Sequence, residues 1–505
     1  GPGRWEGAPA AAPAALPGVR SRARLGAGRR SREPPVVGMG QVANSQQVCF
    51  CGASDDPEVE VEERLAHVRD LVRGEAPVIS AGGGGNGSAR NLAKDIGTAG
   101  ASSAPEVRTP DSVRRRMSLD RASPVQPKIN QVMDSVDHLE QAGLADVFRL
   151  TDLGTRRAVG VCSVTDRDGG RRSSFKEKNE EVFCPPGRAS SEAELMRWLQ
   201  DIGLGWGCKK GLKPDSPNQD SFSILAVEDS FVLIGVYDGH GPKGHDVSQF
   251  AREQMVRGFM THPRRTTNVE AALYDTFIEC QDVIERQGRK LDARDSGSTC
   301  TMVYVDLDKC QLTVAHVGDA RSALGKRKAA VKSAHGAQSV GEMECEDLTI
   351  DHKPNLEAER KRIESASPPG RVVFDGFVNY RVFVQDGMYP GLNMSRALGD
   401  VGAHREAGLT AMPDTRTVDL RPFLGGGYDE LTLLVCTDGV WEFIETAEAF
   451  KIASEVCASG PTAVVNRLAL EAWDRWLADS GGEVSDDITC VCLRLDLALA
   501  KARKA

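Results

Sequence analysis

The sequence predicts an α+β fold of antiparallel sheets with helices on their outer faces. Two observations indicate this fold, and both come from the region between about residue 190 and residue 498. Short β-branched runs alternate there with tight turns, as in antiparallel strands joined by short connections. Longer stretches with helical spacing separate the runs, so helices are expected to cover the sheets. A segment of about 300 residues is long enough for one large hydrophobic core.

The expected elements follow from the period of the apolar residues. Alternation every two residues predicts strands, and spacings of three and four predict helices. The expected strands cover residues 223–227, 231–236, 299–305, 311–317, 431–436 and 488–495. The expected helices cover about 244–261, 268–293, 447–459 and 461–478.

Composition excludes several classes of protein. The chain has 505 residues, a net charge of −9 and 5% aromatic residues. An acidic chain with few aromatic residues is a poor nucleic-acid binder, so no nucleic-acid partner is expected. The 13 cysteines are scattered without paired metal-ligand spacing, which favours a reducing, intracellular and cytoplasmic location. The sequence contains no run of 18 apolar residues, so no membrane-spanning helix is predicted.

The first 38 residues are rich in Ala, Pro, Gly and Arg and do not begin with Met. A transit peptide is one interpretation, because Arg is abundant and acidic residues are few. The other, which we prefer, is a low-complexity leader translated upstream of a start at Met39.

A start at Met39 would make Gly40 a candidate for N-myristoylation. The pattern expects Ser or Thr four residues after the glycine, and this chain has Asn44 there. Cys49 and Cys51 are candidates for palmitoylation, and two acyl chains anchor a protein stably where one does not. The alternatives are therefore peripheral membrane attachment through an acylated N-terminus and an ordinary flexible N-terminus.

The segment before the predicted fold is polar and of low complexity. Residues 39–130 are expected to be disordered, since the glycine-rich run Ala81–Ser88 cannot hold regular structure at low entropic cost. A basic run precedes Ser118, which makes this serine a candidate kinase site. Residues 131–190 are expected to form a linker with a short amphipathic helix, and residues 499–505 a basic tail.

Four aspartates stand at turns far apart in the chain: Asp220, Asp238, Asp438 and Asp486. Three of them lie directly beside runs that read as strands. Carboxylates that converge at strand ends repel one another unless a positive charge lies between them. A hard divalent cation with oxygen ligands relieves that repulsion, so the sequence predicts a metal-dependent hydrolase.

The segment Asp238-Gly239-His240 adds chemistry to this metal site. Gly239 permits close approach of the backbone, and His240 can donate a proton near neutral pH. By itself such a segment is a common loop. Asp438 repeats the strand-then-Asp-Gly design, and Glu442 lies four residues further on, which favours a site over a loop.

These motifs stand in a fixed order: Asn218–Phe222, Tyr237–Gly241, Ser296–Thr299, His316–Arg321, Asp351–Pro354, Ser395–Asp400, Thr437–Trp441 and Asp486–Thr489. The segment that contains them, from about Gly203 to Leu495, resembles the metal-dependent Ser/Thr protein phosphatases of type 2C (PPM). The resemblance implies a phosphatase domain over residues 191–498. It implies a four-layer α/β/β/α sandwich of two antiparallel sheets flanked by helices, with the metal site at one end.

The resemblance also implies a reaction and its residues. It implies a monomer that hydrolyses phosphoserine and phosphothreonine in phosphoprotein substrates by a hydroxide bridging two Mg²⁺ or Mn²⁺ ions. His240 resembles the general acid. The implied metal ligands are Asp238 as the bridge, the Gly239 carbonyl, Asp438 and Asp486, with Asp220 in support and with Asp319 and Glu442 at a third ion.

The chain departs from the family pattern at two places. Gln219 stands where many members have Glu, and Lys213 stands near the position of a phosphate-clamping Arg. A lysine offers a point charge and not a bidentate fork, so phosphate binding by Lys213 is a hypothesis. Arg396 and Asp400 are expected to brace the sandwich. Residues 355–392 are expected to form a flap beside the cleft.

Two other classes compete with the phosphatase interpretation. A catalytically weak relative that acts as a binding or scaffold module would be expected to lose metal carboxylates, and none is lost here. Calcium loops of the EF-hand type would need Asp residues at alternate positions followed by Gly and a distal Glu, a spacing that this sequence lacks.

Overall fold

The computed structural model describes residues 147, 156–164, 167–168, 171–172, 178–185, 191–213, 216–329, 341–424 and 427–502. The expectations for the leader, for acylation of Gly40, Cys49 and Cys51, for disorder over 39–130 and for phosphorylation of Ser118 lie outside these residues. Among the helices of the described residues, none is both long enough and apolar enough to cross a bilayer.

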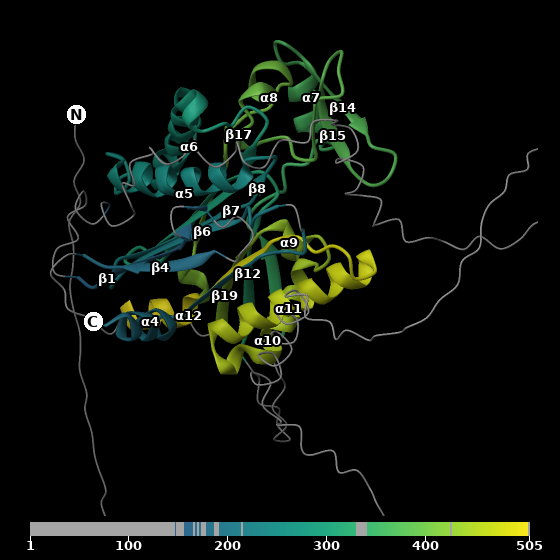
Figure 1. Ribbon diagram of the computed structural model, residues 1–505. Helices are drawn as coiled ribbons and strands as arrows, with labels where there is room; N and C mark the ends of the chain where they lie inside the picture. Colours follow the sequence, from purple (N-terminus) through teal and green to yellow (C-terminus); the bar gives the residue numbers. More distant parts are fainter. Residues whose placement is uncertain are drawn as a thin grey trace, which may run out of the picture. The chain divides into compact units, whose positions relative to one another are not determined.

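Two antiparallel sheets form the centre of the fold (Figure 1). The larger has seven strands, in the order β18 (Asp414–Asp419), β11 (Gln311–Val317), β10 (Cys300–Asp306), β7 (Phe231–Tyr237), β6 (Ser221–Val227), β1 (Ala158–Val164) and β4 (Asn179–Phe183). The smaller has five, in the order β13 (Met343–Asp347), β12 (Arg321–Lys328), β19 (Tyr428–Cys436), β20 (Ile488–Arg494) and β5 (Leu204–Lys209).

Alternation along the strands divides the core into layers. On β19, Leu433 and Val435 belong to the apolar cluster between the two sheets. Leu434 and Cys436 belong to a separate cluster on the opposite face of the same sheet. Successive side chains of a strand point to opposite faces, so a strand buried on both faces needs apolar residues at successive positions, as at Leu433–Cys436 of β19.

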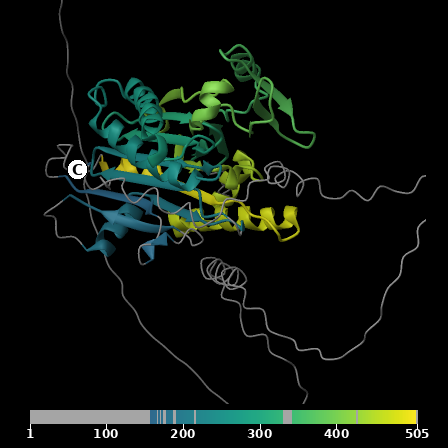
Figure 2. The ribbon, with the colours of Figure 1, turned by 45° about the horizontal axis from the view of Figure 1, so that its top comes forward.

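Helices cover the two outer faces. Helices α5 (Gly244–Thr261) and α6 (Val269–Gln287) pack on the seven-stranded sheet, and α10 (Thr446–Val456) and α11 (Pro461–Ser480) pack on the five-stranded sheet. Figure 2 shows these two pairs on opposite sides of the strands. The predicted four-layer α/β/β/α sandwich is therefore confirmed.

Local sequence explains where these helices begin and end. Asn268 accepts a hydrogen bond from the Ala271 N–H at 3.0 Å and so caps the start of α6. The expected helix over 268–293 ends early, at Gln287, because Gly288 takes a positive φ of 56°. Helix α11 begins with Pro461, whose missing N–H costs nothing in a first turn.

The N-terminal boundary that we expected at residue 191 is too late. Strand β1 pairs with β6, and β4 pairs with β1, so residues of the expected linker extend the seven-stranded sheet. Val159 and Val161 are fully buried between the sheets. The strands β2 (Arg167–Asp168) and β3 (Arg171–Arg172) pair with each other inside the same segment.

Helices α4 (Glu192–Asp201) and α12 (Leu495–Ala502) complete the core between the sheets. Ser191 and Glu194 form a capping box at the start of α4. The basic tail that we expected over 499–505 is wrong for its first residues, because α12 continues to Ala502 and Leu499 is fully buried.

The predicted flap forms a small lobe of its own. It contains α7 (Glu357–Glu364), β14 (Gly370–Phe374), β15 (Tyr380–Val384) and β16 (Pro390–Leu392), followed by α8 (Val401–Glu406). Its apolar cluster includes Ile363, Val372 and Val382. Another small sheet joins β17 (Leu398–Gly399), β9 (Gly297–Ser298) and β8 (Gly239–His240).

Candidate active site

The predicted carboxylates stand at the ends of central strands. Asp220 directly precedes β6, and Asp238 directly follows β7, its hydrogen-bonded neighbour. Asp319 follows β11, Asp438 opens the short helix α9 (Asp438–Trp441) after β19, and Asp486 precedes β20. The antiparallel pairing of β6 with β7 and of β19 with β20 brings the ends of each pair together.

Electrostatics shows which carboxylates lie close together. Burial raises the pKa of Asp238 well above its ordinary value, and the charges of Asp438, Asp220 and Asp319 raise it further. Burial and the charge of Asp487 raise the pKa of Asp220 to about 7. We call Asp220, Asp238, Asp319 and Asp438 the carboxylate cluster. Its members disfavour one another's charge, and a bound cation would relieve this.

The contacts of Asp220 fit a role as a ligand in support. Its Oδ2 accepts a hydrogen bond from the Thr437 hydroxyl at 3.0 Å, and its N–H donates to Asn218 Oδ1 at 3.0 Å. Its Oδ1 is buried and has no hydrogen-bond partner among the described residues, as is also true of Asp319 Oδ1. Two buried carboxylate oxygens without donors are what a hard cation needs as ligands.

No group of three or more His, Cys, Asp or Glu side chains among the described residues is arranged as a ready ion site. The metal assignment therefore depends on the chemistry of the cluster: oxygen donors, burial and mutual repulsion. That donor set suits Mg²⁺ or Mn²⁺ and does not suit metals that prefer sulfur.

The loop that carries Asp238 is packed tightly against its neighbours. A Cβ on Gly239 would lie 2.4 Å from the Gly244 carbonyl oxygen and 2.5 Å from that of Gln219, so this position requires glycine. The Gln219 side chain donates to the Gly241 carbonyl at 2.7 Å. Gln219, which stands where many members of the family have Glu, thus supports the loop that carries Asp238.

His240 pairs with a residue that we expected only to brace the sandwich. Its Nε2 lies 2.6 Å from Asp400 Oδ2, and Asp400 is 2% exposed. Burial disfavours the charged form of His240, but Asp400, followed by Asp319 and Asp438, outweighs this effect and raises the His240 pKa. Arg396 does act as a brace, because it binds both Glu359 on α7 of the flap and Asp414 on β18 of the sandwich.

The remaining predicted residues take different places. The Lys213 ammonium contacts the Asp486 carboxylate, so Lys213 lies beside a predicted metal ligand. Asp319 is buried and contacts the Lys353 ammonium, whereas Glu442 is exposed. The two carboxylates predicted for a third ion therefore differ in environment.

Sequence reasoning missed two lysines. Lys353 lies in the Asp351–Pro354 motif, to which we assigned no role of its own, although a lysine inside a motif was a signal. Lys178, directly before β4, gave no signal, because it lies in the expected linker. It is buried, burial lowers its pKa to about 8, and its Nζ donates to the Asp220 carbonyl at 2.5 Å and to Ser221 Oγ at 2.7 Å.

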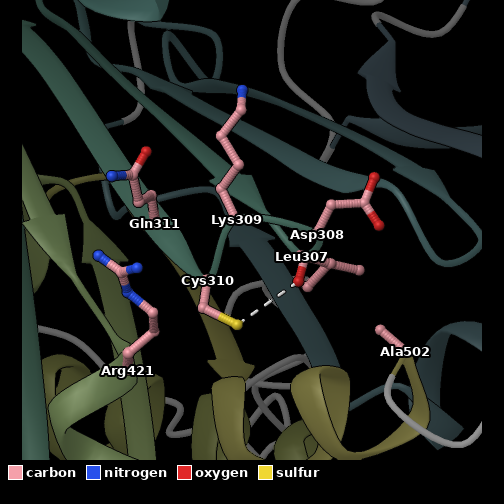
Figure 3. A pocket seen from close by; sticks show the side chains of 7 residues that line it. All are labelled: Leu307, Asp308, Lys309, Cys310, Gln311, Arg421 and Ala502. Atoms are coloured by element: carbon pink, nitrogen blue, oxygen red, sulfur yellow. Dashed lines mark hydrogen bonds between the residues drawn. The ribbon is translucent and has the colours of Figure 1, made fainter. Parts of the chain in front are cut away.

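A pocket of about 530 Å³ lies elsewhere, at the turn between β10 and β11 (Figure 3). Lys309 and Arg421 line it, but each forms an ion pair with an aspartate of its own segment, Asp306 and Asp419. Cys310 in its wall donates to the Leu307 carbonyl. None of the predicted site residues lines this pocket.

The order of the motifs predicted a type 2C phosphatase, and the comparison with known families agrees. The family model described as Protein phosphatase 2C matches residues 213–481. The chain belongs to this family.

The chain is similar to several known proteins. The chain is 29% identical over 298 residues to Probable protein phosphatase 2C 34 of Arabidopsis thaliana, covering 55% of this chain and 76% of the relative. It is 31% identical over 300 residues to Probable protein phosphatase 2C 48 of Oryza sativa subsp. japonica, covering 55% and 79%. The crystal structure of a serine-threonine phosphatase 2C from Toxoplasma gondii aligns with a TM-score of 0.47 at 20% identity, covering 58% of this chain and 94% of that one.

Proposed function

We propose that this protein is a phosphatase that hydrolyses phosphoserine and phosphothreonine in phosphoproteins with the help of Mg²⁺ or Mn²⁺. The observation that carries the proposal is the carboxylate cluster beside His240. Burial and mutual repulsion raise the pKa of Asp238 and of Asp220, and functional sites are where such strongly shifted groups gather. A cluster of this kind is costly to a fold unless it serves a bound cation.

Several carboxylates and one backbone carbonyl are the candidate metal ligands. We propose Asp238 as the bridging ligand with the Gly239 carbonyl beside it, Asp438 and Asp486 as further ligands, and Asp220 as a supporting one. Asp319 and Glu442 are the candidates for a third ion. When bound, such ions would lower the pKa of a water molecule toward neutrality and so supply a hydroxide for the attack on phosphorus.

The other residues handle the substrate. His240 lies two residues from the bridging ligand, where it would protonate the departing serine or threonine oxygen. Lys213 contacts Asp486 at the edge of the same cluster, where its ammonium would attract a phosphate dianion as a point charge. The attack on phosphorus is a single displacement, so no side-chain nucleophile is needed.

The location and assembly of the protein are part of the proposal. We expect a monomer that acts inside the cell, with a phosphatase domain that starts no later than β1. Gly40, Cys49 and Cys51 are its candidate acylation sites. Mass spectrometry of the native N-terminal peptide would detect a myristoyl group on Gly40, and an unmodified peptide that begins upstream of Met39 would contradict this part.

The function is tested with two carboxylate variants. Asp238→Asn and Asp438→Asn are each expected to lower Mn²⁺-dependent hydrolysis of a phosphoserine peptide by a factor on the order of 10³, since each removes a ligand charge. Circular dichroism should show an intact fold. The matched control is Asp429→Asn, an exposed aspartate on β19, which should retain wild-type activity.

The outcome separates the phosphatase from a scaffold protein of the same fold. A wild-type protein without Mn²⁺-dependent turnover, equal to both Asn variants, would contradict the proposed function. Turnover that survives removal of divalent ions with a chelator would contradict the metal dependence alone.

A further inference from the structure

A two-residue strand from each of three segments holds His240 opposite Asp400. In this small sheet β9 lies in the middle, with β8 on one side and β17 on the other. Gly297 of β9 pairs with His240 on β8 and with Gly399 on β17. Asp400, the residue after Gly399, therefore reaches His240 across the backbone of Gly297.

The backbone at Asp400 takes a conformation that side chains rarely adopt. Its φ is 42°, in the left-handed region, which is unfavourable for residues other than glycine. The Asp400 N–H donates to the Ser296 carbonyl at 2.8 Å, which fixes this conformation beside β9. A strained backbone that aims a carboxylate at a histidine indicates a functional constraint.

Gly297 provides a second, independent observation. A Cβ at this position would lie 2.1 Å from Asp400 Oδ2 and 2.7 Å from His240 Nε2. The absence of a side chain at Gly297 is therefore what allows the carboxylate and the imidazole to meet. Glycine weakens a strand, so strand propensity does not explain Gly297, whereas the close approach of Asp400 and His240 does.

The two ring nitrogens of His240 have different surroundings. Nε2 lies 2.6 Å from Asp400 Oδ2, and a carboxylate can only accept, so Nε2 carries a hydrogen and donates it. Nδ1 is buried and has no hydrogen-bond partner among the described residues. It is the nitrogen left to serve a bound substrate.

We propose that Asp400 is a positioning residue that fixes the His240 ring through Nε2, so that Nδ1 delivers the proton to the leaving group. The inference rests on the proposed phosphatase function. In the reaction, an oxygen from water forms the new bond to phosphorus and its proton passes to solvent. The old P–O bond breaks, and the serine or threonine oxygen keeps the electron pair and takes the Nδ1 proton. Solvent then returns a proton to Nδ1.

The test compares two leaving groups in the variant Asp400→Asn. Asparagine has the shape of aspartate and tolerates the left-handed backbone, so the fold should survive. A serine alkoxide needs a proton as it leaves, whereas p-nitrophenolate does not. General-acid catalysis contributes about 10²-fold or more, so kcat for a phosphoserine peptide should fall by about that factor, and kcat for p-nitrophenyl phosphate by much less.

A second variant reaches the same pair without removing a functional group. Gly297→Ala inserts a methyl group between Asp400 and His240 and should lower the ratio of peptide kcat to p-nitrophenyl phosphate kcat at least about tenfold, as Asp400→Asn does. Glu406→Gln, an exposed change on the helix that follows Asp400, is the matched control and should leave the ratio unchanged.

The outcomes distinguish a failure of the positioning role of Asp400 from a failure of the proposed phosphatase function. If both substrates slow by the same factor in Asp400→Asn and in Gly297→Ala, or if neither slows, Asp400 does not act through the leaving-group proton and the inference is overturned. If the wild-type protein hydrolyses neither substrate with Mn²⁺, the proposed function fails first.

Discussion

Two buried acidic groups of this domain differ in how their charge is balanced. In the carboxylate cluster, burial and like charges raise the pKa of Asp238 and of Asp220. In the flap, burial alone would raise the pKa of Glu359, but hydrogen bonds from Arg396, Arg362 and Ser395 outweigh it and lower the pKa to about 2.

The contacts explain the difference. Glu359 Oε1 accepts from Arg396 Nη2 at 2.6 Å, and Oε2 accepts from Arg362 Nη2 at 2.8 Å and from Ser395 Oγ at 2.7 Å. The flap group thus has its donors built in, and it holds α7 to the segment before β17. The carboxylate cluster keeps two oxygens without donors among the described residues, on Asp220 and Asp319. Buried carboxylate oxygens that have no donor of their own are suited to bind a cation from solution.

The largest expected effect is a difference in stability between two variants, each of which replaces one acid of one group by its amide. Glu359→Gln removes the acceptor charge that Arg362 and Arg396 share, while Arg396 keeps Asp414, and it should lower the free energy of unfolding by about 3 kcal/mol. Asp238→Asn removes one of several like charges and should leave the metal-free protein equally stable or more stable. Urea unfolding with a chelator present measures both.

Asp429→Asn, at an exposed position, serves as the reference for an amide substitution in this experiment. A loss of stability of similar size in Asp238→Asn and Glu359→Gln would show that the two acidic groups are balanced alike, and the comparison would fail.

The sequence predicted the layers and the strand-end acids because both depend on local patterns. Strand β11 begins and ends where the alternation predicts, at Gln311 and Val317, and α5 spans the expected 244–261. The acids Asp220, Asp238 and Asp438 could be recognised because each stands next to an apolar run. The four-layer arrangement itself came from the resemblance, since period alone does not order strands in a sheet.

Partners that come from distant segments could not be predicted. Asp400 meets His240 only because two other strands place Gly297 between them. Lys178 reaches Asp220 only because β4 pairs with β1 and β1 with β6. Such contacts depend on strand order and register, which no spacing along the chain encodes.

Lys178 brings a built-in cation behind the carboxylate cluster, from a position just before β4 and outside the matched residues 213–481. Lys353, which contacts Asp319, is a second built-in cation of this cluster. Lys178→Met removes the charge of Lys178 and takes a donor from the Asp220 carbonyl. The metal-free protein should lose about 2 kcal/mol of unfolding free energy. Calorimetric unfolding with a chelator measures this loss.

The matched control for Lys178→Met is Glu181→Gln, an exposed change on the neighbouring strand β4, which should have little effect. If Lys178→Met proved as stable as wild type without metal, the cluster would gain nothing from a lysine behind it, and the contrast with the flap would be complete.

The smallest effect concerns pH and has opposite signs in the two groups. The pKa of Glu359 is about 2 in the folded protein, below about 4.3 when unfolded. Its contribution to stability is therefore present above pH 4.3 and is lost as the pH falls toward 2. The pKa of Asp220 is raised to about 7, so metal-free protein should instead lose stability as the pH rises from about 4 to 7. Solvent screening limits the Glu359 effect to the order of 1 kcal/mol. Urea unfolding of wild type, Glu359→Gln and Asp220→Asn across pH 3 to 8 measures both slopes, and a shared sign would refute the comparison.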